Sequence, residues 1–325
     1  MSLALAGCAT AAPETETPVA DGPATINIVA TGSLDFSAVD LAKWQENMQA
    51  DGFTVDLKFV EAADEALRAV LAGAADAYIG SLPTMITAVQ NTQAPIKLVA
   101  VNAQATDYVV VAKNDVKNLD DLAGKNVGVN TPGSAGDTIM KLAMDNEGFN
   151  VDAANYIVIG GTSARVAALQ AGQIDATVAH LASAQAAIAT GDFKSLLNCG
   201  PALGRYLQSG LMLSDAYIAK DPAVVQRAVN ALIDAERWAA TDKDGYLELS
   251  SGLDTETSDD AKSKAYDDFV NIEFFGVDGG LDEDGVDNWL ETSVKAGDLP
   301  SDYPAKKEWL DDSFVKAYLD ANGTF

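Results

Sequence analysis

Short polar and aromatic side chains recur in the loops that follow predicted strands, and these residues are the best suited to binding chemistry. The single histidine of the chain, His180, directly follows the short predicted strand 175–179 (DATVA). An imidazole at a strand end can donate or accept a hydrogen bond near neutral pH. His180 is therefore a candidate ligand contact, although a lone histidine commonly serves as a structural hydrogen-bonding group.

The other candidates share one setting, a loop directly after an apolar strand and in several cases before a helix. Exposed N–H groups at a helix N-terminus favour anionic or strongly accepting ligand atoms, and an aromatic ring offers a flat apolar wall. Ser134 could equally cap its own helix, and aromatic residues near strand ends often belong to the core. With His180, the predicted ligand contacts are Ser33, Leu34, Phe36, Ser81, Leu82, Tyr108, Thr131, Gly133 and Ser134. The loops 31–36, 80–85 and 130–134 contain no lysine or arginine, which disfavours a small inorganic anion.

Signatures of catalysis and of metal binding are weak. One histidine excludes a multi-histidine metal site, and the sequence contains no Gly-x-x-x-x-Gly-Lys phosphate loop. The stretch Gly280 to Glu291 partly matches a calcium-binding loop, but glycine occupies the first ligand position, so an acidic helix cap is the better interpretation. We predict no catalytic residues, no metal and no cofactor.

Two similar helix–strand units are expected to position these loops. In Ser163 to His180 a helix begins at Ser163, whose hydroxyl is expected to cap it, and a strand ends at His180. The stretch Ala66 to Gly80 has the same pattern, and aligning Ala-Gly-x-x-Asp-Ala at Asp76 with the copy at Asp175 gives an offset of 175 − 76 = 99 residues. The repetition predicts two related α/β lobes, with ligand bound at the C-terminal ends of their strands.

The order of the elements predicts an α/β fold with two parallel-type sheets joined by a two-strand hinge, followed by a helical C-terminus. Lobe one is expected to comprise residues 25–107 and 210–325, and lobe two residues 108–209. Tyr108 to Ala112 would carry the chain into the second lobe and Gly210 to Leu213 back to the first. Two crossings between lobes indicate a hinge.

From Pro222 onward the sequence is helical in character. The segments around Phe269, Trp289 and Trp309 are expected to form helices wrapped on the first lobe. This helical part is less diagnostic of function than the two α/β units.

Composition excludes several classes of function. The 325 residues carry 21 basic and 48 acidic side chains, a formal net charge of −27. Nucleic-acid binding needs clustered lysine and arginine, which the chain lacks, and docking on anionic lipid is disfavoured for the same reason. No apolar run reaches the length of a membrane-spanning helix.

The first 24 residues have a separate character. Leu5-Ala6-Gly7-Cys8 resembles a bacterial lipobox, after which Cys8 would become a lipidated N-terminus. Residues 9–24 combine proline with alanine, threonine and glutamate, a composition that cannot form a core and is typical of an exposed tether. Residues 1–24 are therefore interpreted as a lipobox and flexible tether.

Several motifs together carry a family resemblance. They are Asn118 to Val129 (NLDDLAGKNVGV), Asn130 to Ser134 (NTPGS), Arg165 to Ala176 (RVAALQAGQIDA) and Ala66 to Ala77. With them the chain resembles the bacterial solute-binding proteins of ABC importers in the nitrate/sulfonate/taurine and thiamine-precursor (pyrimidine) group.

The resemblance implies a type II periplasmic-binding-protein fold in which a small molecule, a sulfonate-like anion or a heteroaromatic compound, is held between two lobes. It also implies delivery to an ABC permease in the membrane. The protein is then expected to be a monomer located in the periplasm or on the outer face of the cell membrane, anchored through Cys8.

Two other classes of function stay open. An enzyme that synthesises a pyrimidine precursor shares this fold, but its chemistry would be expected to use histidines that this chain lacks. A ligand-sensing domain would need only the two lobes. The lipobox and tether favour a transport component over both.

Overall fold

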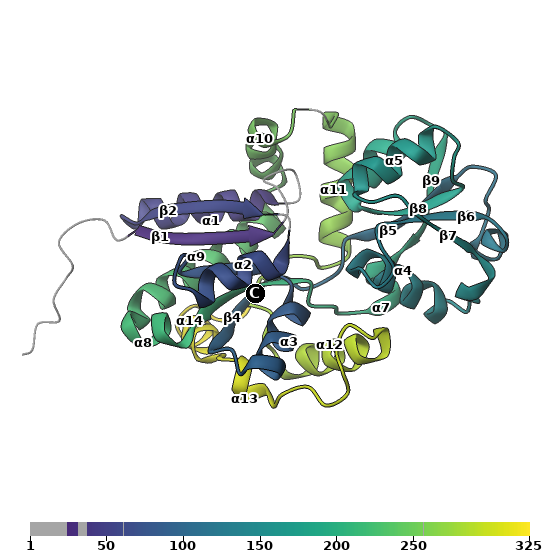
Figure 1. Cartoon of the computed structure of the whole chain (residues 1–325). Coiled ribbons are helices and arrows are strands. Elements are labelled where there is room, and N and C mark those ends of the chain that lie inside the picture. Colours follow the sequence, from purple (N-terminus) through teal and green to yellow (C-terminus); the bar gives the residue numbers. More distant parts are fainter. Residues whose placement is uncertain (1–24, 32–37, 61, 256) are drawn as a thin grey trace, which may run out of the picture.

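The computed structural model describes residues 25–31, 38–60, 62–255 and 257–325. Two lobes lie side by side, each built on a five-stranded sheet with helices on its faces (Figure 1). The predicted contacts Ser33, Leu34 and Phe36, and the predicted lipidation site Cys8, lie outside the described residues. None of the described helices is both long and apolar enough to cross a membrane.

The first sheet has the strand order β2-β1-β3-β10-β4. Its strands are β1 Thr25–Thr31, β2 Thr54–Val60, β3 Ala77–Gly80, β4 Ile96–Ala103 and β10 Ser209–Ser214. Strand β1 pairs in parallel with β2 and β3, whereas β10 runs antiparallel to both β3 and β4.

The second sheet repeats this arrangement with the order β7-β6-β8-β5-β9. Its strands are β5 Tyr108–Lys113, β6 Asn126–Val129, β7 Asn155–Val158, β8 Ala176–His180 and β9 Phe193–Asn198. Strand β5 is antiparallel to both of its neighbours, β8 and β9. Each sheet is therefore mixed rather than purely parallel: the strand that enters from the other lobe, β5 or β10, arrives in the opposite direction to its neighbours.

Helices connect and cover these strands. Those between the strands of the two lobes are α1 Val39–Ala50, α2 Ala63–Leu71, α3 Leu82–Thr92, α4 Ala135–Asn146, α5 Thr162–Gln170, α6 Leu181–Ile188 and α7 Cys199–Leu203, with short 3₁₀ turns at Leu119–Leu122 and Val151–Ala153. The C-terminal helices are α8 Asp215–Lys220, α9 Pro222–Thr241, α10 Lys243–Leu253, α11 Asp259–Asn271, α12 Glu283–Ala296, α13 Lys306–Trp309 and α14 Ser313–Asn322.

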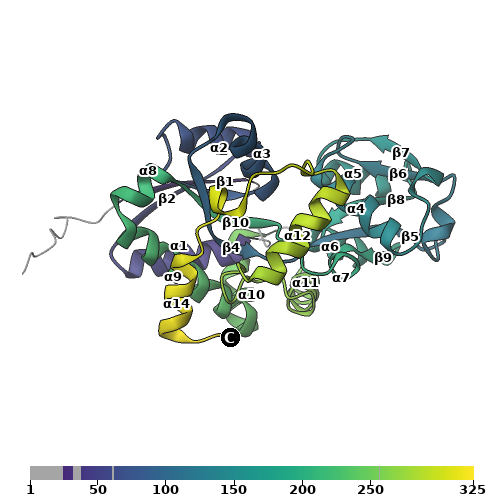
Figure 2. The same cartoon turned by 90° about the horizontal axis from the view of Figure 1, so that it is seen from below.

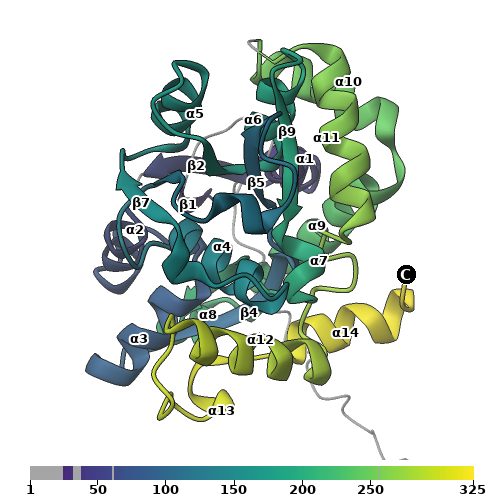
Figure 3. The same ribbon diagram turned by 90° about the vertical axis from the view of Figure 1, so that its right-hand side faces the viewer.

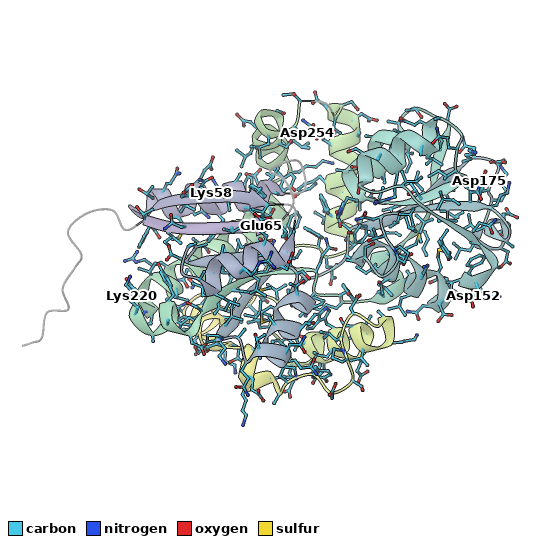
Figure 4. The ribbon with its side chains drawn as sticks, viewed as in Figure 1. Lys58, Glu65, Asp152, Asp175, Lys220 and Asp254 are labelled. Carbon is cyan, nitrogen blue, oxygen red and sulfur yellow. The ribbon has the colours of Figure 1, made fainter. Side chains whose placement is uncertain are left out.

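The two helix–strand units are alike in atomic detail. The Asp76 carboxylate accepts a hydrogen bond from the backbone N–H of Asn27 at 2.8 Å, and Asp175 accepts one from Asn126 at 3.1 Å. Each aspartate thereby ties the start of its strand, β3 or β8, to the start of the neighbouring one. The acceptors and donors are both 99 residues apart, so the repeat in sequence is a repeat in structure. Figure 4 shows Asp175 on the side of the second lobe that is remote from the first.

A glycine ends the helix of each unit, whereas the predicted serine cap does not form. Gly73 and Gly172 follow α2 and α5 with φ of +70° and +74°, a conformation that side chains with a Cβ rarely adopt. Helix α5 begins one residue earlier than predicted, so Gly161 occupies the cap position and the Ser163 side chain makes no cap hydrogen bond.

The C-terminal helices divide between the lobes. Helix α9 packs on α1, where the Trp44 indole donates to the Ala228 carbonyl at 2.9 Å, and Trp289 and Trp309 meet edge to face with centroids 6.3 Å apart. Helix α11, which carries Phe269, packs instead against α6 of the second lobe (Figure 3). The segment around Phe269, expected to wrap on the first lobe, therefore packs on the second, because its apolar face completes the core beside β5.

Helix α12 also reaches the second lobe, where it meets α4 (Figure 2). Lys295 near its C-terminal end donates to the Asn146 side chain at 2.7 Å. Its N-terminus is capped by Asp282, which accepts from the Gly285 N–H at 2.8 Å. The calcium-like stretch is thus an acidic helix cap, as its sequence indicates.

Candidate functional site

An open cleft of about 1160 Å³ lies between the lobes. Both lobes and both crossings contribute to its wall, through Ile79 and Gly80 of the first sheet, Tyr108 and His180 of the second, and residues 206–209 of the return crossing. Strands β1 and β2 point toward the second lobe (Figure 1). The cleft therefore lies at the C-terminal strand ends, the place where open α/β sheets bind ligands.

The structure brings five predicted contacts together in this cleft: Ser81, Tyr108, Gly133, Ser134 and His180. Two others lie elsewhere. Leu82 is fully buried in the core of the first lobe, because the first residue of α3 turns inward. Thr131 is exposed on a turn and does not line the cleft.

His180 is held by the carboxylate of Asp107. Its Nδ1 lies 2.9 and 3.0 Å from the two carboxylate oxygens, and its ring stacks on Tyr108 with centroids 4.5 Å apart. Asp107 is only 1% exposed, whereas the His180 side chain is 40% exposed. The pair therefore presents a fixed imidazole to the cleft while its carboxylate stays buried.

Asp107 also joins the two crossings. Gln208 donates from Nε2 to the Asp107 carboxylate at 3.0 Å and accepts from the Asp107 N–H at 3.3 Å. Nearby, Arg205 donates to the Gln104 side chain at 2.8 Å. Burial acts to raise the pKa of Asp107, but the interaction with His180 and the bonds from His180 and Gln208 outweigh it and hold the pKa below its ordinary value. The hinge is thus organised around one ionised carboxylate.

Protein oxygens accept from backbone N–H groups next to the three helix N-termini that face the cleft, although α4 itself has no side-chain cap. At α6 the N–H of Leu181 bonds to Asp107. Just before α4 the Asp137 carboxylate accepts from the Gly133 N–H at 2.9 Å, and Ser134 makes no side-chain cap hydrogen bond to its own helix. At α3 the Ser81 N–H donates to the Tyr78 hydroxyl at 2.8 Å. The Ser134 Oγ is buried and has no hydrogen-bond partner in the protein.

A pair of buried acids lies behind the cleft wall. Asp40 and Glu236 are 1% and 0% exposed, and Asn102, which lines the cleft, donates to Asp40 at 3.3 Å. Burial raises the pKa of both carboxyls, most strongly that of Glu236, which also faces the charge of Asp40. Burial therefore favours the protonated form of both carboxyls. The Asn102 Oδ1 has no partner.

Arg165, near the start of α5, has a structural role. It is 3% exposed, and its guanidinium donates to the Val178 carbonyl at 3.0 and 3.1 Å, to the Thr162 hydroxyl at 3.1 Å and to the Gly160 carbonyl. These bonds hold the start of α5 against β8. The guanidinium donors are therefore bonded to protein oxygens.

Sequence reasoning missed several cleft residues: Asp107, Asn102, Tyr206, Gln208 and Asp298. Asp107 carried a usable signal, because it directly precedes the predicted crossing strand. Asp298 carried none, since it follows α12 and reaches the cleft only through the path of the C-terminal chain. In the described part of the chain, histidine, cysteine and acidic side chains form no group that could hold a metal ion.

This architecture defines a class. Two mixed α/β lobes joined by two crossings, with a cleft at the strand ends and a helical C-terminus, form the fold of periplasmic solute-binding proteins. The chain belongs to the NMT1/THI5-like family, which it matches over residues 23–245. The prediction of a solute-binding protein of the sulfonate and thiamine-precursor group is confirmed at the level of the family.

Individual relatives agree on the fold. A binding protein of Brucella abortus (strain 2308) is 24% identical over 242 residues, covering 67% of this chain and 70% of the relative. The periplasmic sulfonate-binding protein SsuA of Methylobacillus flagellatus superposes with a TM-score of 0.71 at 16% identity, covering 92% of this chain and 94% of that one. The desulfurization enzyme DszB superposes with a TM-score of 0.65 at 18% identity, covering 92% and 99%.

Proposed function

We propose that the protein is the extracytoplasmic solute-binding component of an ABC importer, which captures a small organic molecule between its lobes. The observation that carries the proposal is the cleft of about 1160 Å³ walled by both lobes and both crossings. Its size suits a small molecule, and its mixture of aromatic rings with a few fixed polar groups suits specific recognition.

The hinge gives this proposal a mechanism. Ser81 belongs to the first lobe and Ser134 and His180 to the second, so one molecule can contact all three only when the lobes close on it. Closure follows if the closed form offers more partners, because the ligand then shifts the population toward that form. A permease that binds the closed form more tightly than the open form would select the ligand-loaded protein. A monomer is sufficient for this mechanism.

Ligand binding is expected to stabilise the protein through the cleft. At a free ligand concentration a hundredfold above Kd, the free energy of unfolding should rise by about 2.7 kcal/mol. His180→Ala should weaken binding by about 1–3 kcal/mol if a ligand group is left unpaired. Ser134→Ala should leave the ligand-free protein nearly as stable as wild type, because its hydroxyl has no protein partner.

Isothermal titration with the molecule that co-purifies with the protein, identified by native mass spectrometry, measures these effects. Unchanged affinity in both variants would place the pocket elsewhere. A lower melting temperature of ligand-free His180→Ala, with unchanged affinity, would return His180 to a structural role.

We also propose that the protein is held at the outer face of the membrane through a lipid on Cys8, on the basis of Leu5-Ala6-Gly7-Cys8 and the tether behind it. Expressed behind a complete lipoprotein signal, the wild-type chain should partition into the detergent phase. The Cys8→Ser form should remain in the aqueous phase. Equal membrane association of the two forms would contradict this proposal.

The enzymatic alternative draws on the DszB fold and on the His180–Asp107 pair, an arrangement that general bases use. Mass spectrometry separates the two functions. A binding protein returns its co-purified ligand unchanged in mass after prolonged incubation, whereas an enzyme converts it.

A further inference from the structure

The charges around the cleft are unbalanced. Two basic side chains line it, and each has a carboxylate partner: Arg68 bonds to Asp64 at 2.6 Å, and His180 to Asp107. A third lining carboxylate, Asp298, has no basic partner among the described ion pairs and accepts instead from the Tyr206 hydroxyl at 2.8 Å. The described wall therefore carries one acid more than it can neutralise.

Several of the usual means of holding an anion are already used within the protein. At α3 the Ser81 hydroxyl accepts from the Thr84 N–H at 3.4 Å, and at α6 the Leu181 N–H bonds to Asp107, whereas α4 begins without a side-chain cap. Buried Arg165 donates to backbone carbonyls and the Thr162 hydroxyl. An incoming sulfonate would find no basic side chain in the described wall that lacks a carboxylate partner, in a protein of net charge −27.

The surroundings of Asp298 suit a cation. Of the four aromatic residues that line the cleft, Phe59, Tyr108, Tyr206 and Phe274, Tyr206 contacts Asp298 directly through its hydroxyl. Aromatic faces attract ammonium and guanidinium groups, and most strongly where water is excluded. Asn102 adds an acceptor, because it is 5% exposed, lines the cleft, and has an Oδ1 without a partner in the protein. Behind it lies the buried Asp40–Glu236 pair.

From this arrangement we infer that the cleft takes an organic cation, a small molecule whose protonated amine or amidine bonds to Asp298 among the aromatic rings, rather than a sulfonate. The inference rests on the proposed solute-binding function and assigns the chemical class of the solute. Asp298 is then the residue that determines charge specificity, and Tyr206 fixes the orientation of its carboxylate.

The test uses probes that differ in charge on similar skeletons. Ethylammonium, 2-phenylethylammonium and benzamidinium are compared with ethanesulfonate, 2-phenylethanesulfonate and benzenesulfonate, by the shift in melting temperature of the full chain and by titration calorimetry. At least one cation is expected to raise the melting temperature and no sulfonate is. Stabilisation by sulfonates alone would overturn the inference and leave the proposed function standing. Failure of both sets, with no co-purified molecule, would count against the proposed function itself.

Two matched variants test the role of Asp298. Asp298→Asn keeps an acceptor for Tyr206 and removes the charge, so affinity for the bound cation should fall by about 10- to 100-fold. Asp145→Asn removes the same charge from an exposed position on α4 outside the cleft wall and should change affinity less than about threefold. Equal affinities of the two variants for the cation would show that Asp298 does not contact it.

Discussion

Replacing Asp107 by alanine is expected to lower the free energy of unfolding by about 3 kcal/mol, because the substitution leaves several buried partners unpaired. Asp107 accepts from His180 and from Gln208, and it bonds to the N–H of Leu181 at the start of α6. The loss should be somewhat smaller than for a fully buried pair, since the His180 side chain is 40% exposed. Thermal and urea unfolding followed by circular dichroism measure it.

The pH dependence of this stability loss distinguishes the loss of the Asp107 charge from a simple packing defect. The pKa of Asp107 lies below its ordinary value of 3.8 in the folded protein, so the folded state binds fewer protons there than the unfolded chain. The contribution of Asp107 is therefore complete above pH 4 to 5 and is lost as the pH falls through the folded pKa. The stability difference between wild type and Asp107→Ala should shrink over that range. The exposed control Asp115→Ala should show neither effect, and a difference independent of pH would contradict the account.

The Gly276→Ala variant is expected to lose about 3 kcal/mol of stability. A Cβ built on Gly276 would lie 2.0 Å from the carbonyl oxygen of Val101, a backbone atom of β4 that cannot move aside cheaply. The Gly276 N–H also donates to the Asn102 carbonyl at 2.7 Å, and Phe275 bridges to Ala103. The added methyl group should push this segment off the sheet.

Because Phe274, Asn102 and Ala103 line the cleft, Gly276→Ala should also weaken ligand binding. The control is Gly252→Ala in α10, where a Cβ would meet no atom within 4 Å and helix propensity favours alanine by about 1 kcal/mol. Differential scanning calorimetry should order the proteins as Gly252→Ala at or above wild type and Gly276→Ala far below. A Gly276→Ala protein as stable as wild type would show that the segment is not held against β4.

Much of the fold is local in origin and was accessible from the sequence. The two αβ units were predicted from short patterns because glycine stops and buried strands act within a few residues, and the shared role of Asp76 and Asp175 explains why the pattern repeats. The cleft position followed from the rule that ligands meet strand C-termini. Strand direction in β5 and β10 depends on the return path of the chain, and no local pattern encodes it.

Less of the candidate site could be predicted from the sequence, because part of it depends on the long-range path of the chain. Ser81, Tyr108 and His180 line the cleft because each adjoins a strand end, whereas Leu82, one residue further along than Ser81, points into the core. Asp298 reaches the cleft from a part of the chain with no recognisable motif. Its role depends on long-range packing, as does the placement of α11 on α6.

The central claim is that one small molecule is bound between the lobes, in contact with both. A crystal structure of the protein with its co-purified ligand tests this most directly. The account predicts density for the ligand between Ser81 on one side and Ser134 and His180 on the other, with the lobes closed around it. Density on an outer surface, or contact with one lobe only in a cleft that stays open, would contradict it.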